Sequence, residues 1–426
     1  CNGNQLTYLN MKNGVTDGLT HFNATNNDSL ECIETLDTTY ATENWTYVNG
    51  NIDEGVSFSI NCAPAGYTYV PDDNFEQALI DLGYDDLLDG YVITDSINTV
   101  TTLNVSHDSI SDLTGIEDFI ALTYLFCAQN QLTSLDVSNN TALTHLYCAN
   151  NDLTSIDVSN DTSLLVIHCH YNDLTSLDLS ENILLSNLEA WNNNLTSLDV
   201  SNNIALRGLN LHHNDLISLD VSSNTALTYL NINHNDMESL DVSQNTELTT
   251  LYVGSNSLTS LDVSANTALD DFRCYNNQLT SLDVSNNTLL TYLHTGTNQL
   301  TDLDVSQNTE LTTLYVGSNS LTSLDVSANI ALTLLKCPSN QLISIDVSAN
   351  IALEILDLWN NQLTTLDVNN NTALITLKAS SNDIIALDVS ANTALTELYC
   401  NNNQLTYLNM KNGITDTLTT FNATNN

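Results

Sequence analysis

The sequence predicts a mostly β solenoid, in which coils of one repeated unit stack along a single axis. Two observations support this prediction. A 21-residue unit, LTYLFCAQNQLTSLDVSNNTA at 122–142, recurs without insertion or deletion through most of the 426-residue chain. Apolar and polar residues alternate in both halves of the unit, which is typical of extended backbone rather than helix. One unit cannot bury its own apolar face, so successive units are expected to stack and share a continuous core.

Each half of the unit has a predictable role. The first half, L-x-x-L-x-C-x-x-N, predicts a short strand and the turn after it, and with the following x-L it is the signature of a leucine-rich repeat. Asn occupies the turn position in all fourteen regular coils, from Asn130 to Asn403. An inward amide there can satisfy buried backbone groups of neighbouring coils. The fold class is therefore a leucine-rich-repeat solenoid with extended segments on both sides of each coil.

Four segments are expected along the chain. Residues 1–32 read as the terminal coil of a preceding array, and residues 33–70 as a β-rich connector. Residues 71–99 predict an N-terminal cap with one helix at about 72–83, because Pro-Asp-Asp-Asn opens an amphipathic stretch that Gly ends. Residues 100–426 form the solenoid, including its own terminal coil. The helix is expected to cover the open edge of the first coil.

The connector carries two further signals. Its aromatic and β-branched residues flank Asn49-Gly50, a pair that predicts a β-hairpin. Ala63–Gly66 reads as a flexible joint.

The nine cysteines fall into two groups. Seven share one repeat position, which other coils fill with Ala, Leu, Ile, Val or Thr, so Cys acts there as a small inward hydrophobe: Cys1, Cys127, Cys148, Cys169, Cys274, Cys337 and Cys400. Cys32 and Cys62 lie outside this pattern, flank the irregular connector, and are expected to form a disulfide. One bridge of this kind is typical of an oxidising, extracellular setting.

The two ends of the chain repeat each other. Residues 1–27 and 400–426 differ at four positions only and lie 399 residues apart. In both, L-N-M-K-N-G replaces the regular loop and lengthens it, as terminal coils commonly do. Residues 240–266 and 303–329 are identical as well. These duplications predict one period of a tandem array of modules.

The 21-residue unit, the YVPDDNFEQALIDLGYDD segment and the LNMKNG coil resemble the leucine-rich repeats of secreted Bacteroidota surface proteins. That resemblance implies export by type IX secretion, a location at the extracellular cell surface, and no catalytic residues.

Composition excludes several functions. Six lysines and arginines stand against 51 aspartates and glutamates, a formal net charge of −45. Nucleic-acid binding is not expected, because it depends on clustered basic residues. Membrane insertion is not expected either, because the apolar runs are far too short to span a bilayer. No Ser/His/Asp order, Gly-rich phosphate loop or inward acid pair is found, so we expect no enzymatic activity.

The aspartate of L-D-V-S recurs on the outside of successive coils. Calcium is the one cofactor considered, since oxygen ligands suit it and neighbouring carboxylates repel one another. The alternative is that each Asp accepts hydrogen bonds from the following Ser and is otherwise solvated. The candidate calcium ladder comprises Asp136, Asp157, Asp178, Asp199 and Asp220.

The variable positions of the first half-unit form the candidate binding surface. The position after the Cys slot reads His170, Trp191 and His212 in three successive coils. Stacked rings there could bind a glycan or a partner protein, and neighbouring imidazoles could hold Zn²⁺ or Cu²⁺. The other interpretation is sequence drift on a tolerant solvent face. The remaining candidates are His168, His213, Tyr229 and His234, and the basic residues Arg207, Arg273, Lys336 and Lys378 lie on or beside the same positions.

Two functions follow from these patterns. The duplications favour a repeating structural module of a long cell-surface fibre or giant adhesin, which self-associates and makes adhesive contacts. The ring-rich positions favour a discrete recognition module that binds a surface glycan or protein.

Overall fold

A computed structural model describes residues 1–12, 18–19, 21–59, 62–64, 66–411 and 418–426. The chain divides into two compact units, Cys1–Ala142 and Leu143–Asn426.

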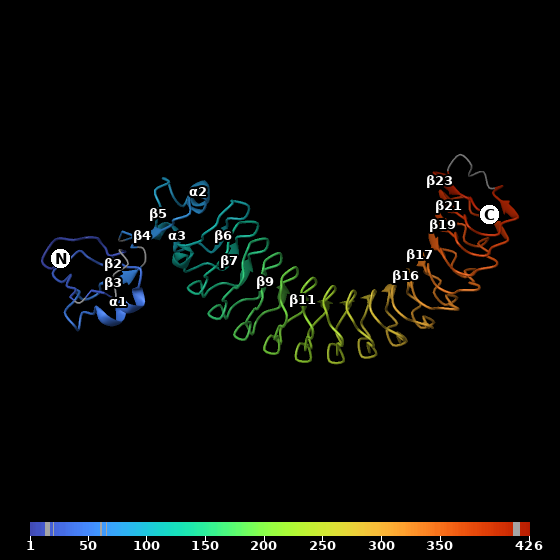
Figure 1. Ribbon diagram of the computed structural model, residues 1–426, viewed down its shortest axis with the longest axis horizontal. Coiled ribbons are helices and arrows are strands. Elements are labelled where there is room, and N and C mark those ends of the chain that lie inside the picture. Colours follow the sequence, from blue (N-terminus) through green and yellow to red (C-terminus); the bar gives the residue numbers. More distant parts are fainter. Residues whose placement is uncertain (13–17, 20, 60–61, 65, 412–417) are drawn as a thin grey trace. The chain divides into compact units, whose positions relative to one another are not determined.

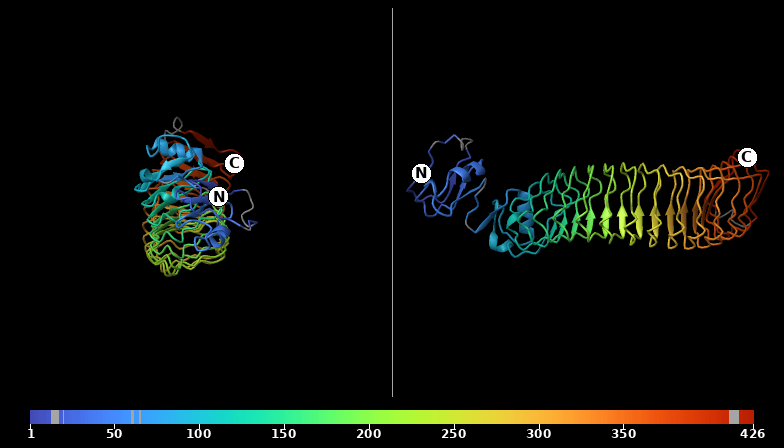
Figure 2. Two further views of the ribbon diagram at one scale, coloured as in Figure 1. Left: turned by 90° about the vertical axis from the view of Figure 1, so that its left-hand side faces the viewer. Right: turned by 90° about the horizontal axis from the view of Figure 1, so that it is seen from below.

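Unit 2 is a β-solenoid, as the repeat predicts. Each coil contributes one short parallel strand. From β8 to β21, paired residues of neighbouring strands lie 21 positions apart in the sequence, for example Leu188 and Leu209, and between β21 and β23 they lie 23 apart. The coils stack side by side along a curve, with the strands on its inner side (Figures 1 and 2). The strands are β8 (His145–Tyr147), β9 (Val166–His168), β10 (Asn187–Glu189), β11 (Gly208–Asn210), β12 (Tyr229–Asn231), β13 (Thr250–Tyr252), β14 (Asp271–Arg273), β15 (Tyr292–His294), β16 (Thr313–Tyr315), β17 (Leu334–Lys336), β18 (Ile355–Asp357), β19 (Thr376–Lys378), β21 (Glu397–Tyr399) and β23 (Thr420–Asn422).

The core runs through the middle of the coils. In the coil of β10, Leu185, Leu188, Ala190 and Leu195 are all 0% exposed, and Ala190 fills the slot that holds Cys in other coils. The second half of each unit follows a regular, non-helical path on the outer side of the curve. There a strand ladder is described only between β20 (Ala386–Asp388) and β22 (Tyr407–Asn409). Elsewhere the curvature spreads the coils on that side (Figure 1).

Two rows of buried asparagines join successive coils. In the turn row, Asn193 accepts a hydrogen bond from the Leu174 N–H at 3.0 Å and donates to the carbonyls of Cys169 and Ala190 at 3.1 and 3.0 Å. In the second row, the Asn203 amide donates to the Leu179 and Asn182 carbonyls at 3.0 and 2.9 Å. The turn row was predicted from the motif, and the second row was not.

The first part of unit 1 differs from the expected hairpin. Strands β1 (Leu9–Asn10), β2 (Cys32–Glu34) and β3 (Ser57–Ser59) form a parallel sheet, and helix α1 spans Thr38–Asn44. The hairpin prediction was therefore wrong, although Asn49-Gly50 does lie in a turn. Asp37 explains the helix, because its carboxylate accepts a hydrogen bond from the Tyr40 N–H at 2.8 Å and caps the first turn.

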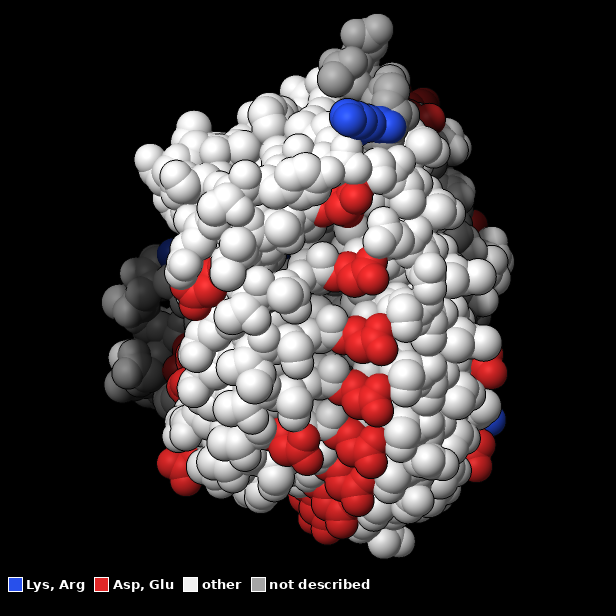
Figure 3. Space-filling view, turned by 90° about the vertical axis from the view of Figure 1, so that its right-hand side faces the viewer, with Lys and Arg blue, Asp and Glu red and all other residues white. Residues whose placement is uncertain are grey.

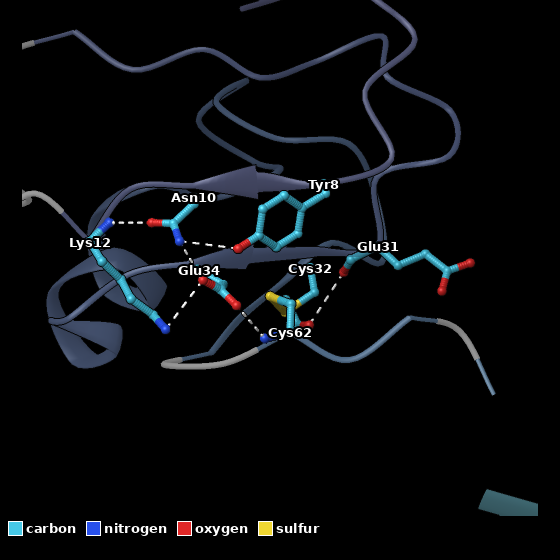
Figure 4. Close-up of a disulfide and its surroundings, with 8 residues drawn as sticks. Tyr8, Asn10, Lys12, Glu31, Cys32, Glu34 and Cys62 are labelled. Atoms are coloured by element: carbon cyan, nitrogen blue, oxygen red, sulfur yellow. Dashed lines mark hydrogen bonds and ion pairs between the residues drawn. A yellow bond between two sulfur atoms is a disulfide. The ribbon is translucent and has the colours of Figure 1, made fainter. Parts of the chain in front are cut away.

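Cys32 and Cys62 are joined by a disulfide with their Cα atoms 5.8 Å apart (Figure 4). The proposed joint at Ala63–Gly66 includes residue 65, and the lengthened terminal loops include residues 13–17 and 412–417. All of these lie outside the described residues.

The N-terminal cap surrounds helix α2 (Asp73–Asp81), which matches the helix expected at 72–83. One carboxylate oxygen of Asp72 accepts from the Asn74 and Phe75 N–H groups, and the other accepts from Ser111 and Asp112 of the first coils. Asp72 thus fixes the helix and ties it to the array. The remaining elements of unit 1 are β4 (Tyr67–Tyr69) antiparallel to β5 (Tyr91–Ile93), α3 (Thr94–Ile97), β6 (Thr102–Asn104), the 3-10 turn η1 (Ile116–Asp118) and β7 (Tyr124–Phe126).

Candidate functional site

The strand face is the surface formed by the outward residues of strands β8 to β19, β21 and β23 and by the two outward residues after each Cys slot. In the coil of β10 these are Asn187, Glu189, Trp191 and Asn192. The pairing is in register, so equal positions of neighbouring coils lie one strand spacing apart, about 4.8 Å. This spacing suits the stacking of flat side chains.

Three of the predicted residues form a stack on this face. The ring centroids of His170 and Trp191 lie 4.4 Å apart with an interplanar angle of 6°. Trp191 and His212 follow at 4.6 Å and 18°. Tyr171 adds a T-shaped contact to Trp191 at 4.5 Å. Both faces of the indole are therefore covered by imidazoles, and its edge faces outward.

The stack continues through the turn after the strand. His212 meets His213 edge to face at 5.1 Å, and His213 stacks on His234 at 4.2 Å and 5°. Both turn histidines have a left-handed backbone, with φ of 54° and 55°, as the residue at this turn position has in every coil described. At the other end, His168 lies 6.1 Å from His170. We call the run from His168 to His234 the ring ladder.

The structure brings six of the seven predicted binding residues together in the ring ladder: His168, His170, Trp191, His212, His213 and His234. Tyr229 lies apart from them and contacts Tyr252 at 5.9 Å.

A second group on the strand face was not predicted as a site. The Arg273 guanidinium lies between the rings of Tyr252 and Tyr292, 4.4 Å from each centroid. Asp271 holds it with two hydrogen bonds of 2.9 and 2.7 Å and accepts a third from the Tyr252 hydroxyl at 2.7 Å. Burial, the Asp271 hydrogen bond and its charge raise the pKa of Tyr252. The scarcity of basic residues was the available signal, because Arg273 is one of only six.

Tyr275 links the two groups because a glycine makes room for it. A Cβ atom on Gly254 would lie 2.5 Å from the Tyr275 ring, so the ring lies directly over this backbone. Tyr275 then reaches His234 at 6.5 Å and stacks on His294 at 4.7 Å. His294 contacts Tyr315 at 4.9 Å, and the Lys336 ammonium lies 5.0 Å from that ring.

Comparison with known proteins shows to which family this chain belongs. No family model matches it. The solved functional domain of internalin J from Listeria monocytogenes, described as including a cysteine ladder, is 38% identical with a TM-score of 0.68; the alignment covers 80% of this chain and 72% of that one. The chain belongs to the internalin-like leucine-rich-repeat proteins.

Two further comparisons agree on the fold. A leucine-rich-repeat protein of Leptospira interrogans is 25% identical, with a TM-score of 0.68, over 74% of this internalin-like chain and 87% of its own. The ectodomain of a plant membrane receptor kinase from Arabidopsis thaliana, solved in complex with Casparian strip integrity factor 2, has a TM-score of 0.62 at 20% identity, over 78% of this chain and 48% of that one, and shows the fold alone.

The sequence match to full-length internalin J is short. It is 38% identical over 73 residues, 17% of this chain and 8% of that protein. The Bacteroidota resemblance and type IX secretion stay predictions.

Three imidazoles on the strand face of this internalin-like protein, those of His170, His212 and His294, are uncharged at neutral pH. Burial is the main cause, and together with nearby imidazoles or cations it lowers the pKa of each to about 4. The Nδ1 atom of His170 is buried without a hydrogen-bond partner. On both sides of Trp191 the ring ladder therefore presents neutral imidazoles, in a protein whose net charge is −45.

The metal hypotheses stay predictions. Within the described part of the chain, no group of three or more His, Cys, Asp or Glu side chains is placed to hold a metal ion. In the candidate calcium ladder, each carboxylate accepts a hydrogen bond from the N–H two residues on, at 2.9–3.0 Å. Hydrogen bonds from the following serine lower the pKa of Asp157, Asp178, Asp199 and Asp220. Figure 3 shows acidic side chains in a column from coil to coil.

No helix among the described residues has the length and apolar character needed to span a membrane.

Proposed function

We propose that this internalin-like chain is a non-enzymatic adhesion module of an extracellular surface protein, and that its strand face binds a protein on another cell or surface. The observation that supports this most strongly is the ring ladder. It is a run of half-buried to exposed rings on the strand face. Two buried side-chain oxygens of the same strands, Oδ1 of Asn187 and of Asn210, lack hydrogen-bond partners.

The geometry favours a protein over a glycan. Sugars pack on the open faces of aromatic rings, but His170 and His212 cover both faces of Trp191. The ladder instead offers ring edges and N–H groups, together with Arg273 held by Asp271. Aromatic residues and arginine are the types enriched in protein interfaces.

Two tryptophans at the same coil position provide the test. Trp191 and Trp359 lie 168 residues, or eight units, apart. Pro338 and Ser380, rather than rings, flank Trp359 in the neighbouring coils, and Trp359 is 47% exposed. The purified chain is applied to arrays of immobilised cell-surface proteins and of glycans. Trp191→Ala should weaken binding to proteins at least tenfold, as an interface anchor does, and Trp359→Ala should not. Equal binding by the two variants, or binding to glycans only, would contradict the proposal.

A second proposal concerns assembly, and the duplicated ends favour it. We propose that the chain is one module of a longer tandem array, which forms a fibre. Both ends use the same closing bonds: the Cys1 nitrogen donates to the Asn23 carbonyl at 3.1 Å, and the Cys400 nitrogen donates to the Asn422 carbonyl at 2.8 Å. Electron microscopy of intact cells should show fibres whose axial repeat matches one 399-residue module. Short isolated particles would contradict it.

A further inference from the structure

The two copies of the terminal coil, residues 1–27 and 400–426, share several hydrogen bonds in their described parts but have different surroundings. The Gly3 N–H donates to the Thr25 carbonyl at 2.9 Å, and the Asn402 N–H donates to the Thr424 carbonyl at 2.9 Å. The amide of Asn27 donates to the Ala24 carbonyl at 2.7 Å, and that of Asn426 to the Ala423 carbonyl at 2.6 Å. Even the exchange of Gly3 for Asn402 keeps a left-handed backbone, with φ of 68° and 54°.

In the first copy, residues 28–62 cover the coil. Leu9 and Asn10 of β1 pair with Ile33 and Glu34 of β2. Phe22 stacks on Trp45 with centroids 4.2 Å apart. The resulting core contains Ala24, Leu30, Ile33 and Ile52, with Leu6, Leu9, Met11, Phe22, Val56 and Phe58 packed against it.

Polar contacts also hold the 28–62 segment against the first copy of the terminal coil. The Asp53 carboxylate accepts hydrogen bonds from the Asn26 and Asn27 N–H groups, both at 2.9 Å. Asn51 accepts from the Ala24 N–H at 2.7 Å. Glu34 accepts from the Asn10 amide at 2.7 Å and lies 3.2 Å from the Lys12 ammonium (Figure 4).

In the second copy the groups that correspond to the covered ones are exposed. Phe421, which corresponds to Phe22, is 50% exposed. Asn426 is exposed, whereas its counterpart Asn27 is 0% exposed. β22 pairs only with β20, and β23 only with β21, so each keeps one edge without a partner strand among the described residues. Open strand edges of this kind bind further strands readily.

We infer that the described part of the second terminal coil, residues 400–411 and 418–426, is a docking edge, and that its occupant is a further copy of the 28–62 segment. Ile33 and Glu34 of that copy would pair beside β22, Trp45 would stack on Phe421, and Asp53 would accept from the N–H groups of Asn425 and Asn426. Glu34 would also meet Lys411, the counterpart of Lys12. The inference does not depend on ligand binding by the strand face or on fibre formation.

The test adds a synthetic peptide of residues 28–62, with its disulfide closed, to the full chain. We expect one peptide per chain by calorimetry, and hydrogen-exchange protection that appears at Ala423, Asn425 and Asn426. In the peptide, Asp53→Ala removes two charge-assisted hydrogen bonds and should weaken binding at least about tenfold. Val48→Ala is the matched control, because Val48 is 91% exposed, and it should bind normally.

A variant of the chain completes the test. Phe421→Asp should abolish peptide binding without changing the circular dichroism of the solenoid, because Phe421 is half-exposed at its end. A chain extended after Asn426 by a second 28–62 segment should show the same protected amides in cis. No protection in either format overturns the inference. Binding that is insensitive to both Asp53→Ala and Phe421→Asp, or self-association through β23 that the peptide does not compete with, overturns it too.

Discussion

At the scale of the residue, one asparagine per turn holds the coils in place. The Asn193 side chain satisfies three backbone groups that lie in two coils, at 3.0–3.1 Å, and it is only 7% exposed. A buried backbone group left without a partner costs about 1–3 kcal/mol. The amide is thus the main local reason why this turn can be buried at all.

Asn193→Ala should therefore destabilise unit 2 by roughly 3 kcal/mol or more, because it leaves one donor and two acceptors unsatisfied. The adjacent Asn194 is exposed, so Asn194→Ala should change stability by less than about 0.5 kcal/mol. Urea unfolding followed by circular dichroism compares the two. Similar unfolding midpoints would show that the buried amide does not stabilise the turn.

The sequence was sufficient to predict the turn row, because its Asn stands at a fixed place in the motif. It did not predict the second row, since the Asn of S-N-N-T-A looks like a solvated loop residue. Asn203 is buried only because carbonyls of the preceding coil meet it. The ring ladder could be predicted because its residues occupy equivalent positions in successive units. The Arg273 group and the placement of Tyr275 could not be predicted, because they depend on the directions that side chains take across coils.

At the scale of the element, Gly254 leaves the space that lets the Tyr275 ring reach His294. Gly254→Ala would place a Cβ atom 2.5 Å from the Tyr275 ring and force that ring away from His294. We expect a loss of about 1–3 kcal/mol from overpacking. Tyr275→Ser removes the clash, so the double variant should lose less than the sum of the single variants. A double-mutant cycle measured by urea unfolding checks this, and additive losses would contradict it.

The histidines make the stability of unit 2 depend on pH. The pKa of His170, His212 and His294 is about 4 in the folded chain and about 6.5 in an unfolded one. Between these values the unfolded state binds more protons, so stability should fall as pH drops from about 6.5 to about 4. Four aspartates of the candidate calcium ladder titrate below this window, because hydrogen bonds from serine lower their pKa: Asp157, Asp178, Asp199 and Asp220.

Thermal melting at pH 7.5 and pH 4.5 measures the effect. A variant with Gln at His170, His212 and His294 should show a smaller shift than the native chain. Equal shifts would mean that other groups cause the loss.

At the scale of the whole molecule, the cysteines separate into exposed and enclosed groups. Seven are outside the disulfide; Cys1 is exposed and the other six are buried in the core. Burial raises the pKa of the Cys127 thiol to about 12 and that of Cys400 to about 11. A maleimide should thus label one thiol in the native chain and seven in denaturant without reductant. Cys1→Ser should reduce native labelling to none. Rapid labelling of several thiols in the native chain would show that the core opens.

In both asparagine rows, the side-chain hydrogen bonds run in the same direction along the chain. The side chains of Asn193 and Asn203 bond to backbone groups of their own coil or of the coil before them. A growing chain can therefore complete these bonds for each coil as soon as that coil leaves the ribosome, because the partners are already in place. The array can fold progressively from its N-terminus while the remainder is still being made.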